Sequence, residues 1–302
     1  MTIVGRYAPS PTGPLHLGNL RTALLSWLHV RMQDGIFLLR IDDLDAPRNV
    51  EGGIDHICKD LEWLGLDWDN HSAAALSSHT QSHRNHFYQQ AFEKVLQSDL
   101  VFECSCSRKD ITQAASAPHS GGSVSIYPGT CRKGPLKPDR PLAWRFKVVS
   151  EVIEFEDQLM GPIKENPINT SGDFVIKRKD GVFAYQFASV VDDGLMGVTD
   201  VLRGADLLDS TARQICLFKS LGFDIPRFWH VPLMNDQQGQ KLSKRDGSSD
   251  LRSFKNQGMG PEQVVGHLAY SCGLIPEDSA ISCRDLLAGL DMPRFRSCLS
   301  PI

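Results

Sequence analysis

Strand-like and helix-like hydrophobic patterns alternate along the first hundred residues. Apolar residues spaced three and four apart, such as Ile57, Leu61 and Leu64, indicate one face of a helix. The run 36–41 is continuously apolar apart from one arginine, as expected for a buried parallel strand. The predicted order is strand 3–7, helix 17–32, strand 36–41, helix 50–64 and helix 82–97. Such an order predicts an α/β fold with a doubly wound parallel sheet.

The pattern changes twice further along the chain. Cysteine, proline and short strand-like pieces at 143–148 and 174–177 predict that residues 98–180 form an insertion between the two halves of the α/β domain. Alternation returns over 181–247 and completes the sheet begun by residues 1–97. Residues 248–302 are predicted to be mostly helical.

Composition and charge set only broad limits. The 302 residues carry a net charge of −4, so a nucleic-acid partner would require a local basic surface. No secretory signal is visible at the start, and no apolar stretch is long enough to span a membrane. We therefore expect a cytoplasmic, reducing location, where the eight cysteines are thiols or metal ligands.

The first chemically suggestive segment is the proline- and glycine-rich loop 6–19, between a predicted strand and a predicted helix. Ligands of open α/β sheets bind at this edge, and the helix N-terminus offers N–H groups to a phosphate. His16 adds a donor, and Gly18 allows close approach to the backbone. The alternative is a proline-rich turn with a capping histidine.

A second segment, Lys241-Leu242-Ser243-Lys244-Arg245, is bordered by glycines. Its two lysines could neutralise the charge that develops as pyrophosphate leaves a triphosphate. The alternative is an exposed basic turn.

Together these strings resemble the HIGH and KMSKS signatures of class I aminoacyl-tRNA synthetases. Residues 6–13 and 39–43 are similar to the glutamyl/glutaminyl branch of that family. The resemblance implies a Rossmann-like catalytic domain that activates glutamate with ATP and Mg²⁺, with His16, Lys241 and Lys244 as catalytic residues. It also implies that ATP contacts His16, Gly18, Asn19, Asp206, Lys241, Leu242, Ser243, Lys244 and Arg245. Asp206 could equally cap the helix that follows it.

Glutamate presents two carboxylates and one ammonium group. Arginines suit the carboxylates and an aspartate suits the ammonium, although a single arginine is more often part of a surface ion pair. The resemblance implies a glutamate site formed by Arg6, Ala8, Ser10, Asp42, Tyr185 and Arg203. Two positions depart from the family pattern: Asp42 stands where glutamate is usual, and Ser189 stands where asparagine is frequent.

Three cysteines, Cys104, Cys106 and Cys131, are grouped as in a zinc site that lacks a known fourth ligand. The pattern resembles the zinc knuckle of the glutamyl-queuosine branch of the family, which implies that Tyr127 completes one structural Zn²⁺ site. The remaining cysteines show no grouping.

Because few residues follow Arg245, we expect no anticodon-binding domain and expect the last segment, 248–302, to be a stem-contact remnant. The glutamyl-queuosine branch implies a monomer that activates glutamate without tRNA. It then transfers glutamate to queuosine in the anticodon loop of tRNA(Asp). The alternatives are a shortened glutamyl-tRNA synthetase that charges a tRNA 3′ end, a catalytically silent tRNA-binding paralogue, and a nucleotidyltransferase with another substrate.

Overall fold

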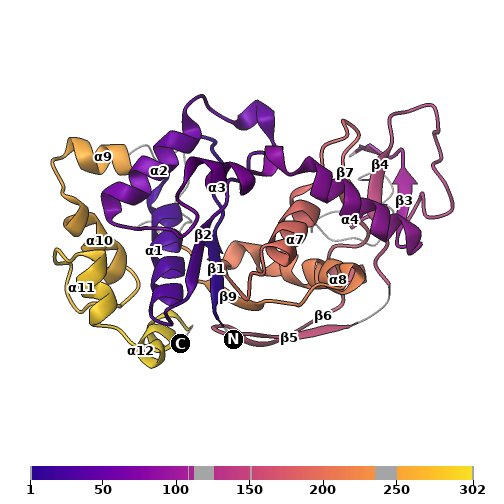
Figure 1. The fold of residues 1–302 in the computed structure, drawn as a ribbon. Helices are drawn as coiled ribbons and strands as arrows, with labels where there is room; N and C mark the ends of the chain where they lie inside the picture. Colours follow the sequence, from indigo (N-terminus) through magenta and orange to yellow (C-terminus); the bar gives the residue numbers. More distant parts are fainter. Residues whose placement is uncertain (1, 108, 112–125, 150–151, 235–249, 301–302) are drawn as a thin grey trace.

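The computed structural model describes residues 2–107, 109–111, 126–149, 152–234 and 250–300, and Figure 1 shows their arrangement. A six-stranded sheet has the order β2-β1-β8-β9-β5-β6. Its strands are β1 (Val4–Tyr7), β2 (Ile36–Leu39), β5 (Ile153–Asp157), β6 (Gly161–Glu165), β8 (Asp200–Gly204) and β9 (Arg227–Val231). A separate three-stranded sheet has the order β3-β4-β7, formed by β3 (Val101–Cys104), β4 (Ala143–Phe146) and β7 (Phe174–Lys177).

Helices surround the larger sheet. They are α1 (Leu17–Arg31), α2 (Gly53–Leu64), α3 (Ala73–Ser78), α4 (Asn85–Gln97), α6 (Pro167–Thr170), α7 (Tyr185–Leu195), α8 (Thr211–Leu221), α9 (Leu251–Asn256), α10 (Pro261–Tyr270), α11 (Cys283–Ala288) and α12 (Met292–Leu299). Short 3₁₀ turns occur at η1 (Ala46–Arg48), η2 (Gln81–His83) and η3 (Ala205–Ser210). The helix predicted to begin at residue 50 begins later because Gly52 has a left-handed φ of 67°. Within the residues described, no helix is both long and apolar enough to cross a membrane.

The predicted parallel sheet is confirmed except at one edge, where the sheet is mixed. Neighbouring strands from β2 through β5 are parallel, but β6 pairs antiparallel with β5. The physical reason is the short turn 158–160 between β5 and β6, which is closed by the pair Asp157 and Gly161, with a φ of 81° at Gly161. A hairpin of this kind can connect only antiparallel strands. Residues 153–165, which the sequence assigns to the insertion, therefore extend the larger sheet.

Strand β8 was not predicted, although it lies between β1 and β9 in the middle of the sheet. Its residues point alternately to opposite faces, as strand geometry requires. Val201 packs into a core with α4, α7 and α8, whereas Leu202 packs into a core with α1 and the C-terminal helices. The two cores on opposite faces confirm the α/β arrangement with helices on both sides.

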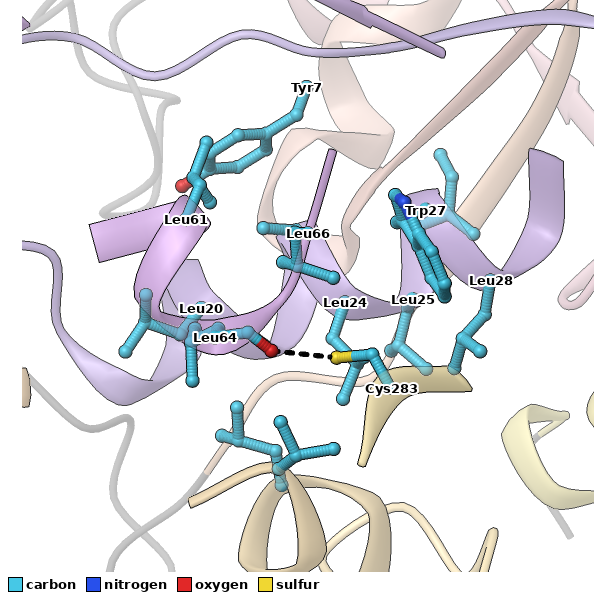
Figure 2. Packing of buried hydrophobic residues seen from close by; sticks show 14 of the residues in the cluster. Tyr7, Leu20, Leu24, Leu25, Trp27, Leu28, Leu61, Leu64, Leu66 and Cys283 are labelled. Carbon is cyan, nitrogen blue, oxygen red and sulfur yellow. Dashed lines mark hydrogen bonds between the residues drawn. The ribbon is translucent and has the colours of Figure 1, made fainter. Parts of the chain in front are cut away.

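The C-terminal helices α10 to α12 pack against α1 and α2 (Figure 1). Figure 2 shows this core, in which Leu20 of α1 lies beside Leu64 of α2, and Leu28 lies further along α1 near Leu25 and Trp27. The thiol of Cys283 from α11 donates to the carbonyl oxygen of Leu64 at 3.0 Å (Figure 2). The C-terminal segment thus shares one core with α1 and α2 rather than standing apart from them.

Candidate active site

A cavity of about 490 Å³ opens at the carboxyl ends of β1, β8 and β9. Ten residues that the sequence predicts for the glutamate and nucleotide sites line this one cavity: Arg6, Ala8, Ser10, His16, Gly18, Asn19, Asp42, Tyr185, Arg203 and Asp206. The predicted lysine-containing segment, from Lys241 to Arg245, lies outside the described residues. The strand ends bring together side chains from positions 6 to 206, as expected where open α/β sheets bind ligands.

His16 forms the N-terminal cap of α1. Its Nδ1 accepts a hydrogen bond from the Asn19 N–H at 3.3 Å. In a neutral ring the proton therefore resides on Nε2, which leaves a donor directed away from the cap. A Cβ on Gly18 would lie only 3.1 Å from the imidazole Cε1 of His16. The glycine therefore makes room for the imidazole ring of His16. In the structure His16 both caps α1 and lines the cavity.

Asp206 lies in the first turn of η3, after the end of β8. The residue at the N-cap of η3 is Gly204, so Asp206 is not the cap that the alternative interpretation required. A Cβ at Gly204 would lie 2.6 Å from Asp206 Oδ1. The missing side chain at Gly204 therefore allows the Asp206 carboxylate to fold over the strand end toward the cavity.

Buried ion pairs hold the floor of the cavity. The guanidinium of Arg40 donates from Nε to Asp42 Oδ1 at 2.7 Å and from Nη1 to Asp193 Oδ1 at 2.7 Å. Arg6 donates from Nε to the same oxygen of Asp193 at 3.1 Å. All four side chains are buried, so these charges are compensated within the protein, as buried charges must be.

Burial has the largest effect on Asp42 and raises the pKa of its carboxyl to about 6, although the Arg40 guanidinium acts in the opposite direction. The neighbouring carboxylates of Asp192 and Asp193 add to the increase. A further cation in the cavity would therefore stabilise the ionised form of the Asp42 carboxyl.

Arg203 differs from Arg6 because its neighbours are neutral. It donates to His230 Nε2 at 3.0 Å, to Gln214 Oε1 at 2.7 Å and to Thr211 Oγ1 at 2.9 Å. Its side chain is only 5% exposed, and burial lowers its pKa. Within the described part of the chain, no carboxylate lies within 4.0 Å of it. A buried cation without a counter-charge on a cavity wall favours an anionic ligand.

The predicted metal ligands also come together, at the end of β3. The Sγ atoms of Cys104, Cys106 and Cys131 lie within 4.8 Å of one another. The phenolic oxygen of Tyr127 lies 3.4 Å from Cys104 Sγ and 3.9 Å from Cys106 Sγ. Four donors on a tetrahedral Zn²⁺ with Zn–S bonds of about 2.3 Å lie about 3.8 Å apart, so this arrangement fits zinc.

Arg145 of β4 supports the cluster and was not predicted from the sequence. Its Nε donates to Cys104 Sγ at 3.3 Å, and its guanidinium carbon lies 3.8 Å from the centre of the Tyr127 ring. A cation in this position compensates part of the negative charge that thiolate ligands would carry.

The sequence pattern of the family described as "tRNA synthetases class I (E and Q), catalytic domain" matches residues 2–281. The chain belongs to this family. It is a class I aminoacyl-tRNA synthetase-like ligase, and enzymes of this class use ATP with Mg²⁺.

Similar proteins agree with this class I assignment. The chain is 43% identical to a glutamyl-Q tRNA(Asp) synthetase of Symbiobacterium thermophilum, over 97% of its own length and 94% of that protein. It is 46% identical to the protein of the same name from Deinococcus radiodurans, over 90% and 89% of the two chains. A solved glutamate-tRNA synthetase from Elizabethkingia anophelis superposes with a TM-score of 0.84 at 29% identity, covering 99% of this chain and 67% of that one.

Several residues that shape the site of this class I synthetase chain escaped the sequence analysis. Arg40 and Asp193 orient Arg6 and Asp42, and Arg21 of α1 lines the cavity and donates to the carbonyl oxygen of Pro232. The signal for Arg40 was a charged residue inside an otherwise apolar strand. Ser189, by contrast, is buried in α7 and is not among the residues that line the cavity.

Proposed function

We propose that this synthetase activates L-glutamate with ATP, without tRNA, and transfers it to queuosine in the anticodon loop of tRNA(Asp). The observation that carries the first step is the single cavity lined by all ten predicted ligand residues within the described part of the chain. The relatives named glutamyl-Q tRNA(Asp) synthetase support the second step.

The charges of the cavity match those of glutamate. Arg203 is a buried cation with no carboxylate within 4.0 Å among the described residues, and Arg6 is a second cation on the same cavity. These two guanidinium groups bind the carboxylates of the substrate. Asp42 accepts from its ammonium group, and Tyr185 and Ser10 contribute hydroxyl hydrogen bonds. A neutral or basic amino acid has only its α-carboxylate to offer, so one of the two guanidinium groups would lack an anionic partner, and the cavity discriminates against such a substrate.

The first chemical step is an attack by an α-carboxylate oxygen of glutamate on the α-phosphorus of ATP, with pyrophosphate as the leaving group. The His16 Nε2–H and the N-terminus of α1 stabilise the transferring phosphate. Lys241 and Lys244 neutralise the departing pyrophosphate, which Mg²⁺ accompanies. A hydroxyl of the queuosine cyclopentene diol then attacks the glutamyl carbonyl and AMP leaves. The chemistry depends on positioning and electrostatics rather than on a protein nucleophile.

One structural Zn²⁺ bound by Cys104, Cys106, Tyr127 and Cys131 belongs to the same proposal. The distances among these four donor atoms support it. The metal would stabilise the small sheet β3-β4-β7, which extends from the side of the catalytic sheet (Figure 1). It has no direct role in the adenylation step because the cluster is not part of the cavity lining.

Glutamate-dependent exchange between ATP and pyrophosphate in the absence of tRNA tests the activation step. Radiolabelled glutamate transfer to tRNA(Asp), purified with and without queuosine, tests the acceptor. We expect exchange without tRNA, and transfer only to the modified tRNA. Charging of tRNA(Glu) at its 3′ end would support the shortened glutamyl-tRNA synthetase instead. Absence of exchange under all conditions would support the silent tRNA-binding paralogue.

A further inference from the structure

Three polar side chains form a chain of hydrogen bonds across neighbouring strands at the edge of the cavity. Arg203 of β8 and His230 of β9 are direct partners in the strand register. Arg203 Nε donates to His230 Nε2 at 3.0 Å, and His230 Nδ1 lies 2.5 Å from Asp157 Oδ2 at the end of β5. Only Arg203 lines the cavity, whereas His230 and Asp157 are fully buried behind it.

The hydrogen-bond chemistry determines the tautomer of His230. A guanidinium Nε–H can only donate, so Nε2 of the imidazole must be an acceptor without a proton. The ring proton therefore resides on Nδ1 and is donated to Asp157. Burial lowers the pKa of His230, which favours this neutral form.

Asp157 is held as the ionised partner at the far end of the chain. Its Oδ1 accepts from the backbone N–H groups of Leu159 at 3.1 Å and Met160 at 2.9 Å. Burial alone would raise its pKa, but the hydrogen bonds from His230 and from Met160 lower it below its ordinary value. Because Oδ1 faces backbone donors, Oδ2 remains as the acceptor for the imidazole proton.

We propose that His230, held in one tautomer by Asp157, is a positioning residue that orients Arg203 toward a substrate carboxylate. The inference rests on the proposed function, because it assumes that the anion bound by Arg203 is glutamate. The partners of Arg203 set the orientation of its guanidinium group and leave its positive charge in place. His230 fixes the Nε side of the guanidinium plane, Gln214 and Thr211 fix its two terminal nitrogens, and none of the three neutralises its charge. The carboxylate of Asp157 is separated from Arg203 by a neutral ring, so the cation retains its attraction for the ligand.

Two substitutions test the tautomer directly. In Asp157→Asn the amide oxygen remains with the backbone donors of Leu159 and Met160, which places the amide NH₂ against His230 Nδ1. That nitrogen must then accept, the proton moves to Nε2, and two N–H donors oppose each other at Arg203. His230→Phe removes the acceptor without replacing it. In His230→Gln the amide oxygen can take the position of Nε2, so this variant should restore part of the lost binding.

The assay is steady-state ATP–pyrophosphate exchange with separate KM values for glutamate and for ATP. Losing or reversing a buried hydrogen bond of a charged group corresponds to roughly a tenfold or larger effect. We therefore expect the KM for glutamate to rise about tenfold or more in Asp157→Asn and His230→Phe. The KM for ATP should change less than about twofold, and His230→Gln should lie between wild type and His230→Phe.

His29 supplies a matched control. It is also a fully buried histidine beside the same sheet, and its Nε2 lies 3.1 Å from Asp200 Oδ1, but it does not contact Arg203. His29→Gln should leave the KM for glutamate unchanged even if it lowers thermal stability. Two results would overturn the positioning role and leave the proposed function intact. One is an equal change in the KM for glutamate and the KM for ATP, and the other is a normal KM for glutamate in a folded Asp157→Asn variant. A wild-type protein without glutamate-dependent exchange would instead remove the proposed function, and this inference with it.

Discussion

The catalytic efficiency of glutamate activation should decrease as the pH falls through about 6, because the substrate ammonium requires an ionised Asp42. The pKa of this carboxyl is raised from 3.8 to about 6 by burial, so protonation begins at a higher pH than for an exposed aspartate. With that pKa the ionised fraction is about 90% at pH 7 and about 10% at pH 5. The value of kcat/KM for glutamate, which reports groups of the free enzyme, should therefore fall about tenfold between these pH values. With an ordinary aspartate pKa, the ionised fraction, and with it kcat/KM, would fall by only about 7% over the same range.

The measurement is ATP–pyrophosphate exchange at saturating ATP, with circular dichroism at each pH to confirm that the protein remains folded. Asp42→Asn should have a lower kcat/KM for glutamate at pH 7 and a flatter profile, and any slope that remains belongs to other groups. Asp45→Asn is a suitable control, because this nearby side chain is 44% exposed and does not line the cavity. Parallel pH profiles for wild type and Asp42→Asn would refute the reasoning.

Three further outcomes are expected. Lys244→Ala should reduce the exchange rate by roughly a hundredfold if the lysine stabilises the leaving pyrophosphate, and near-wild-type exchange would contradict that role. Cys131→Ser should reduce the zinc content from one atom per chain to well below stoichiometry in elemental analysis. A wild-type protein that contains no zinc would contradict the proposed site. Gly266→Ala should lower the free energy of unfolding by about 1–3 kcal/mol or more in denaturant titrations. The reason is that its Cβ would lie 1.9 Å from the Ser279 carbonyl oxygen. An unchanged transition midpoint would show that the backbone can shift.

The tertiary structure shows where local patterns were insufficient. Strand β8 carries Arg203, yet its five residues include two charges and no clear alternation, because a central strand is buried on both faces. The β5–β6 hairpin lies in the predicted insertion, and only its pairing with β9 reveals that it belongs to the larger sheet. Asp157 therefore could not be connected with the site from the sequence.

Features whose chemistry is local could be predicted from the amino-acid sequence. The strand, loop and helix around His16, the apolar face of α2, and the cysteine group all follow from spacing along a short stretch of chain. Which charges compensate one another depends instead on the three-dimensional fold. It pairs Arg6 with Asp193 and leaves Arg203 among neutral groups, with His230 and Asp157 behind it. Pairing and burial depend on strands that are distant in sequence, and burial controls both the pKa of Asp42 and the attraction of Arg203 for an anion.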